Sequence, residues 1–205
     1  MLQRLWEDVP SDAAHVALTA AALRVPEVIA RRFDDLVCVV GEANAWPYRG
    51  GASRHPDELV HWVAHRLATG ETFARIAAPV GPLSPSTAFH CGLSEDALRG
   101  GAPCAEVVAA FARFARPTDV LCAWGHYGLD LVERSGGVVP ERLDLRAHAA
   151  RIANRKLGSL EAYAATLAPS GSPTPVPDSL AEGRAGRRLA LLMQIVHGWR
   201  ASLAR

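Results

Sequence analysis

Several common sequence signatures are missing from this chain of 205 residues, and each absence excludes a class of protein. Charged residues or prolines interrupt every apolar stretch before about 18 residues, so a membrane-spanning helix is not expected. The four cysteines have no CxxC spacing, which argues against a zinc site or a disulfide framework. No GxSxG phrase, P-loop or strand followed by GxGxxG occurs, so serine-hydrolase, P-loop and dinucleotide-binding chemistry is not expected.

What the chain contains fits one globular domain with a well-filled core, because 49% of its residues are hydrophobic and 21% are charged. The formal net charge is only +1, yet from Glu141 onward ten Lys and Arg residues stand against five Asp and Glu residues. A polyanion would therefore meet the C-terminal third first. Because charged residues open the chain before any apolar run, we expect a cytoplasmic protein without a signal peptide.

The order of apolar runs, turn residues and helical periodicity predicts a mixed α/β domain. Five strands are expected, at residues 36–40, 58–67, 72–78, 120–124 and 143–145. Helices are expected at residues 103–115, 125–135, 146–155, 159–167 and 180–204, with helical turns at 85–91 and 94–101. Prolines predict loops at 79–85 and 169–177. Residues 1–35 are expected to form a helical N-terminal extension to a domain at 36–205.

Five phrases, in this order, carry a resemblance to a known family. They are PVGPLSPSTAFHCGLSEDALRGGAPCAEVVAAFARF, VLCAWGHYGLDLV, LDLRAHAA, LGSLEAYAATL and EGRAGRRLALLMQIVHGW. The stretch from Leu36 to Trp199 resembles the DEDDh-type 3′–5′ exonuclease family. The resemblance implies a ribonuclease-H-like mixed five-stranded sheet flanked by helices. It also implies two Mg²⁺ or Mn²⁺ ions held by carboxylates, with a histidine as general base.

The catalytic positions that this resemblance implies are mostly occupied by other residue types. Only Glu42 is retained, because the other four positions hold Val40, Gly128, Gly183 and Arg188. A single carboxylate cannot hold two divalent cations, and a guanidinium beside it would repel them. We therefore expect no metal and no two-metal nuclease chemistry, with Mg²⁺ or Mn²⁺ only if the catalytic acids lie elsewhere.

Two hypotheses concern what the remaining residues do. Arg188 can fold over the former metal position and pair with Glu42, or Glu42 is merely a polar residue left at a strand end. A nucleic-acid-binding surface can be formed by Asn44, Trp46, Trp124, His126, Arg184, Arg187 and Arg188. The alternative is that the tryptophans pack in the core and the arginines lie on a solvated helix face.

The sequence thus predicts a catalytically degenerate exonuclease-like domain that binds single-stranded nucleic acid, or a protein partner through the N-terminal helices. The alternative is a divergent metal-dependent 3′–5′ exonuclease acting on single-stranded DNA or RNA ends. A shift in register that brings in Glu182, His126 or Asp130 could supply one missing ligand. A third possibility is a reused pocket with unrelated chemistry.

Overall fold

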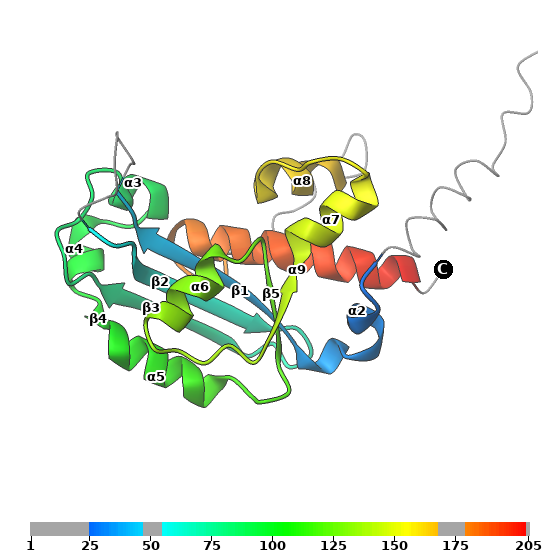
Figure 1. Ribbon diagram of the computed structural model, residues 1–205, viewed down its shortest axis with the longest axis horizontal. Coiled ribbons are helices and arrows are strands. Elements are labelled where there is room, and N and C mark those ends of the chain that lie inside the picture. Colours follow the sequence, from blue (N-terminus) through cyan, green and yellow to red (C-terminus); the bar gives the residue numbers. More distant parts are fainter. Residues whose placement is uncertain (1–24, 47–54, 168–178, 204–205) are drawn as a thin grey trace, which may run out of the picture.

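A six-stranded mixed sheet forms the centre of the fold in the computed structural model, which describes residues 25–46, 55–167 and 179–203 (Figure 1). The strands lie in the order β4-β3-β2-β1-β5-β6. Their bounds are β1 (Leu36–Asn44), β2 (Glu58–Arg66), β3 (Thr72–Ala78), β4 (Ala102–Pro103), β5 (Val120–Ala123) and β6 (Glu141–Asp144). Strands β1, β2 and β3 are antiparallel neighbours, whereas β5 is parallel to both β1 and β6.

All five predicted strands are present, but the prediction of five strands was one short. The sixth, β4, has two residues and pairs in parallel with the end of β3. Gly101 allows this approach, because a β-carbon there would lie 2.7 Å from the backbone nitrogen of Ala78. A two-residue strand that contains a proline has no periodicity to detect, so the sequence did not indicate it.

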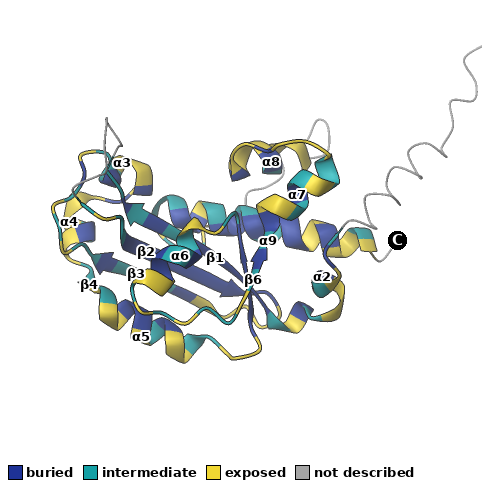
Figure 2. Ribbon diagram, viewed as in Figure 1, coloured by how far each residue is buried: buried dark blue, intermediate teal, exposed yellow. Residues whose placement is uncertain are grey.

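The helices cover both faces of the sheet. Their bounds are α2 (Glu27–Arg31), the 3₁₀ helix η1 (Phe33–Asp35), α3 (Thr87–Cys91), α4 (Glu95–Arg99), α5 (Cys104–Phe114), α6 (Tyr127–Arg134), α7 (Leu145–Ala153), α8 (Leu160–Leu167) and α9 (Gly183–Leu203). Burial is concentrated in the strands and on the inward sides of these helices (Figure 2). The predicted helices are thus confirmed wherever the structure describes them.

Strand β1 explains why the apolar run at its start is continuous. Cys38 and Val40 point into a core shared with α2, α7, α8 and α9, whereas Val37 and Val39 point into a second core shared with α5 and α6. A strand that is covered on both faces needs apolar side chains at every position. The sequence had predicted this burial from the five-residue run that ends at Val40.

The described part of the N-terminal segment packs on the domain. Helix α2 begins directly after Pro26, as the sequence predicted, and buries Ile29. Phe33 of η1 joins the same core as α9. Residues 1–24 of the predicted extension at 1–35, and the predicted loop at 169–177, lie outside the described residues. Among the helices that are described, none is long and apolar enough to cross a membrane.

A buried ion pair joins β2 to the turn that leads into β5. The Arg66 side chain is 1% exposed and that of Asp119 is fully buried. Both guanidinium nitrogens Nη1 and Nη2 of Arg66 donate to the Asp119 carboxylate, the second over 3.0 Å. Asp119 also accepts from the backbone nitrogen of Arg116 over 2.8 Å. The pair ties the turn at the start of β5 to β2.

Candidate functional site

Glu42 lies near the C-terminal end of β1, where the regular pairing with β2 is interrupted. The register shifts between Glu42 and Ala43, as in a β-bulge. Only 8% of Glu42 is exposed, and its Oε1 atom accepts no hydrogen bond within the described residues. A bulge re-aims the side chains beside it, so this local irregularity helps to set the direction of Glu42.

Two arginines one turn apart on α9 lie beside this carboxylate. Arg188 Nη1 is 3.6 Å from Glu42 Oε1, and Arg184 Nε is 4.0 Å from the same oxygen. Of the two hypotheses for Glu42, this geometry agrees with the one in which Arg188 pairs with it. Residues i and i+4 share a helix face, which is why both guanidinium groups reach one carboxylate.

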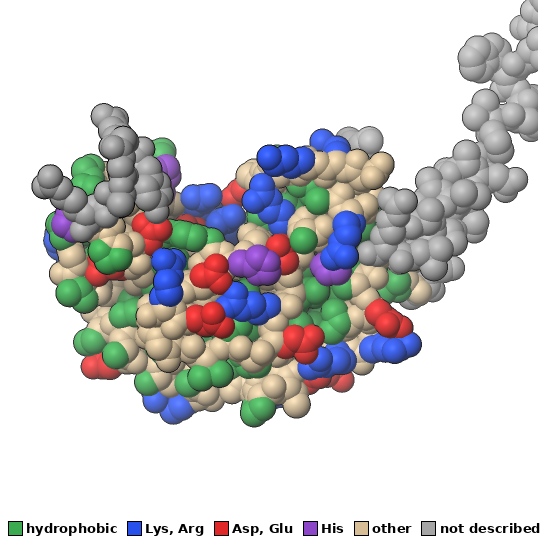
Figure 3. Space-filling view, in the orientation of Figure 1, with side chains coloured by type: hydrophobic (Ala, Val, Ile, Leu, Met, Phe, Trp, Pro, Cys, Tyr) green, Lys and Arg blue, Asp and Glu red, His purple; other side chains and the backbone are tan. Residues whose placement is uncertain are grey.

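A second carboxylate, which no sequence pattern indicated, completes the group. Glu161 Oε1 on α8 lies 3.2 Å from Arg188 Nε and 3.9 Å from Arg184 Nε. We call Glu42, Glu161, Arg184 and Arg188 the charge cluster. Basic side chains gather around the hollow between α3 and α8 in the space-filling view (Figure 3). The phrase that contains Glu161 had been matched to the family, but nothing in its spacing indicated a contact with α9.

Burial and charge act in opposite directions on the two carboxylates. Burial raises the pKa of Glu42 above its ordinary value, and the charges of Arg188 and Arg184 only partly oppose that rise. For Glu161, burial also acts upward, but its own backbone N–H and the same two arginines outweigh it and lower the pKa. The arginines therefore stabilise the ionised form of both carboxylates, as bound cations would.

Gly128 occupies the position where the resemblance implies a second carboxylate. The backbone of β1 lies so close to this position that a side chain there would be crowded. A β-carbon on Gly128 would lie 3.0 Å from the backbone nitrogen of Gly41, because α6 packs directly on the strand. A β-carbon on Gly41 would in turn lie 3.1 Å from the Trp62 ring. An aspartate at position 128 would therefore force α6 away from β1.

Gly183 occupies the position where the resemblance implies the histidine. A side chain at this position is disfavoured both by the backbone conformation and by a neighbouring carbonyl group. Its φ is 67°, in the left-handed region that glycine adopts readily. A β-carbon there would lie 2.6 Å from the carbonyl oxygen of Cys91. Val40, in the first acidic position, belongs to the apolar core that faces α9. These three substitutions thus belong to the packing of the site.

We expect Gly128→Ala to lower the free energy of unfolding by about 1 kcal/mol, measured by urea denaturation. Crowding against Gly41 costs about 1–3 kcal/mol, and the better helix propensity of alanine returns up to about 1 kcal/mol. The control is Gly198→Ala on α9, where a β-carbon meets nothing within 4 Å and which should be neutral or stabilising. Equal stability of the two variants would contradict the close contact.

Asn44, which the sequence placed among the nucleic-acid-binding residues, is used inside the chain. It is 1% exposed. Its amide donates to Glu58 and to the carbonyl of Pro82, each over 3.0 Å. Its oxygen accepts from the Ser84 backbone and the Thr87 hydroxyl, each over 2.9 Å. These bonds leave the side chain no capacity for a nucleotide, so Asn44 ties β1 to the proline-rich loop instead.

The two tryptophans pack against other rings of the chain. Trp46 lies with its ring centroid 5.0 Å from that of His55, and Trp124 lies 5.3 Å from Tyr163. Both are half-buried, and each Nε1 atom is buried without a hydrogen-bond partner among the described residues. Trp124 also lines a cavity beside the charge cluster. Stacking of a base on either ring stays a prediction.

His126 and Arg187 stand apart from Glu42. His126 is exposed, and its Nε2 is 3.4 Å from Asp144 Oδ2 at the end of β6, so it has an acidic partner that the sequence did not indicate. Arg187 is exposed and lines a shallow hollow between α4 and the start of α9. It therefore faces a different surface from Arg184 and Arg188.

Neither of the two carboxylates that a shifted register would bring to the matched positions lies beside Glu42. Asp130 pairs with Arg142 of β6, 2.6 Å away, which places it on the outer side of α6 as its helical position predicted. Glu182 is exposed and lines the shallow hollow. In the ranges that the structure describes, no three His, Cys, Asp or Glu side chains are grouped so that they could hold a metal ion.

The donor set of the site does not fit the pair of divalent cations that the resemblance implies. Hard cations need several oxygen ligands, and Glu42 supplies the only carboxylate at the matched positions. The nearest other carboxylate, Glu161, shares the same two guanidinium groups. Two fixed positive charges already lie where the cations would have to bind.

Comparisons with known proteins give structural likeness at low sequence identity. The fold is similar to that of a 3′-exonuclease whose structure describes specific recognition of the 3′ end of the histone mRNA stem-loop. This comparison gives TM-score 0.61 and 11% identity, and it covers 92% of this chain and 71% of that chain. The nuclease domain of 3′hExo, a DEDDh family member bound to rAMP, gives TM-score 0.58 and 15% identity, with coverage of 85% and 94%.

Pop2p from S. pombe, in a form with Mg²⁺ and Mn²⁺ bound, gives TM-score 0.55 and 10% identity, with coverage of 89% of this chain and 88% of that chain. No protein-family model matches the chain, and no curated protein matches its sequence. The structural likeness nevertheless extends over 85–92% of this chain in these three comparisons. The chain therefore has the ribonuclease-H-like fold of the DEDDh-type 3′–5′ exonuclease domains.

Proposed function

We propose that this chain is a catalytically degenerate 3′–5′ exonuclease-like domain that binds single-stranded nucleic acid without cleaving it. The observation that carries the proposal is the position of Arg188, whose Nη1 lies 3.6 Å from the one retained carboxylate, Glu42. A guanidinium in this place supplies the positive charge that a metal ion would supply, but it cannot activate a water molecule as a metal does.

The packing around the site supports the same proposal. The close contacts of Gly128 with Gly41 and of Gly183 with Cys91 disfavour the acid and the histidine that the nuclease chemistry needs. Reversion of one position would therefore be insufficient. Arg184 and Arg188 still offer donors suited to phosphate, because a planar guanidinium binds phosphate oxygens in a bidentate manner. Loss of cleavage and retention of strand binding are thus compatible in one site.

The test uses the full chain with a fluorescent single-stranded oligonucleotide in the presence of Mn²⁺. We expect no shortening of the strand on a denaturing gel. Fluorescence anisotropy should detect binding that weakens with salt, with a log–log slope of roughly −0.7 for each phosphate contacted, because each contact releases counterions. Binding that does not respond to salt would contradict a phosphate-contacting groove.

Glu42→Ala distinguishes this proposal from the divergent exonuclease. If the wild-type chain shortens the strand with Mn²⁺ and Glu42→Ala abolishes the shortening, the enzyme alternative is correct and the proposal is wrong. If neither shortening nor binding is found, the proposal is also wrong, and a protein partner docked through the N-terminal segment becomes the leading hypothesis.

A further inference from the structure

A cavity of about 400 Å³ opens beside the charge cluster, between the ends of β1 and β5 and the helices α6, α8 and α9. Its wall combines polar groups with the apolar side chains of Val40, Trp124, Leu160 and Leu192. Apolar walls around a few polar groups are typical of small-molecule sites. The cavity is distinct from the shallow hollow that contains Arg187.

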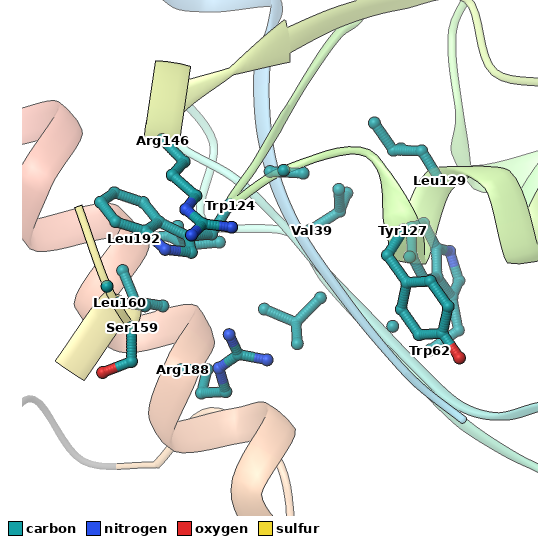
Figure 4. A pocket seen from close by; sticks show the side chains of 16 residues that line it. Val39, Trp62, Trp124, Tyr127, Leu129, Arg146, Ser159, Leu160, Arg188 and Leu192 are labelled. Atoms are coloured by element: carbon teal, nitrogen blue, oxygen red, sulfur yellow. The ribbon is translucent and has the colours of Figure 1, made fainter. Parts of the chain in front are cut away.

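Every charged side chain that lines this cavity is a guanidinium. Arg146 at the start of α7 and Arg188 on α9 point into the same space (Figure 4). No carboxylate of the described residues lines it. The only hydrogen bond that the structure gives Arg146 runs to the carbonyl of Leu157 over 2.9 Å, and no described carboxylate pairs with it. Within the part of the chain that the structure describes, its positive charge therefore has no acidic partner.

Arg188 can serve the cavity and the charge cluster together. It reaches Glu42 through Nη1 and Glu161 through Nε, and the planar guanidinium has five N–H donors. Within the charge cluster two carboxylates balance two arginines, so Arg146 adds a net positive charge to the neighbourhood. The first residues of α6 and α8 also line the cavity, and the partial positive charge of a helix N-terminus favours an anion there.

We propose that this cavity binds a phosphomonoester group between Arg146 and Arg188. A phosphomonoester carries close to two negative charges at neutral pH and offers three oxygens, which suits two converging guanidinium groups. The source that we infer is the 3′-terminal phosphate of a nucleic-acid strand, and this part rests on the proposed function. The apolar wall would contact the sugar and base next to that phosphate.

The experiment measures binding of the full chain to four probes by anisotropy or calorimetry. They are inorganic phosphate, a nucleoside 3′-monophosphate, and one oligonucleotide with either a 3′-phosphate or a 3′-hydroxyl. We expect the 3′-phosphorylated strand to bind about 10-fold more tightly than the 3′-hydroxyl strand, as one charge-assisted contact would give. We also expect inorganic phosphate to reduce that preference in competition.

Arg146→Gln should abolish the preference and leave the affinity for the 3′-hydroxyl strand within about 3-fold, because the variant retains the polar side chain but loses the charge. The matched control is Arg134→Gln at the end of α6. Arg134 likewise bonds a backbone carbonyl, that of Asp130 over 3.3 Å, but lies outside the cavity. That control should keep the preference.

The outcomes separate this inference from the proposed function. If both strands bind equally and phosphate does not compete, the inference is wrong while the binding function stands. If phosphate and the mononucleotide bind in an Arg146-dependent manner but no strand binds, the phosphomonoester site is supported and the proposed function fails. Equal loss of preference in Arg146→Gln and Arg134→Gln would also overturn the inference, because the effect would then be one of overall charge.

Discussion

Asp119→Asn is expected to lower the free energy of unfolding by about 3–5 kcal/mol, the largest effect of any single substitution proposed for this chain. The substitution keeps the shape of the side chain but removes its charge. Arg66, whose side chain is 1% exposed, would then keep a buried positive charge whose remaining carboxylate partner is Glu71, 3.0 Å from its Nε. Removal of one partner from a buried pair leaves the other uncompensated in a medium of low dielectric.

The matched control is Asp130→Asn. Asp130 also pairs with an arginine, Arg142, but its side chain is 48% exposed. An exposed ion pair contributes about 0–1 kcal/mol, so the control should unfold at nearly the wild-type urea concentration. Similar losses in the two variants would contradict the buried role of Asp119. A loss confined to Asp119→Asn would confirm that this pair holds the turn before β5.

The elements that the sequence predicted well are those that local patterns determine. The apolar run before Gly41 predicted a strand buried on both faces, and the glycine at position 70 predicted the hairpin between β2 and β3. At Gly70 the φ is 76°, a value that glycine reaches without strain. Such features depend on residues that are close in the sequence, and a single sequence contains them.

The features that the sequence did not predict depend on residues far apart in the chain. Glu161 meets Arg188 only because α8 packs beside α9, and His126 meets Asp144 only because β5 and β6 are neighbours. Asn44 illustrates the opposite error. Its place at a strand end suggested a ligand contact, but Glu58 of β2, the proline-rich loop and Thr87 of α3 together use all of its hydrogen-bonding capacity. No local pattern carries that information.

The candidate site was predicted in part because one of its pairs follows from a known fold. The resemblance brought Glu42 and Arg188 to one place, and the structure has them there. The resemblance does not indicate how the residues at the other matched positions pack. The packing shows how these positions are filled, because a β-carbon at position 128 would lie 3.0 Å from the backbone of Gly41 in β1, and one at position 183 would lie 2.6 Å from the carbonyl oxygen of Cys91 in α3. In the described residues, the site is a charge cluster beside an arginine-lined cavity.

Arg188→Gln is expected to lower the free energy of unfolding by about 3 kcal/mol near pH 8, because Glu42 would remain buried with its carboxylate poorly compensated. After the substitution, the remaining contact to Glu42 in the charge cluster is Arg184 Nε at 4.0 Å. Glu161 loses its contact at 3.2 Å as well. Urea denaturation at several pH values measures the effect, and Arg187→Gln, which removes an exposed arginine from the same helix, is the control.

The pH dependence of this loss identifies its cause. The pKa of Glu42 is already raised by burial, and removal of Arg188 removes a charge that lowers it, so the variant should raise it further. A carboxyl with a raised folded-state pKa contributes stability that is present below its unfolded pKa and lost as pH rises through the folded value. Glu161 adds to the same pH dependence. Its lowered pKa stabilises the folded chain at pH values above the pKa that Glu161 has in the unfolded chain, and this contribution depends on Arg188. The gap between wild type and Arg188→Gln should therefore be largest near pH 8 and narrow toward pH 5, while Arg187→Gln stays within about 0.5 kcal/mol throughout. A gap that does not change with pH would mean that Arg188 stabilises the chain by packing alone, and the charge cluster would then lose its electrostatic role.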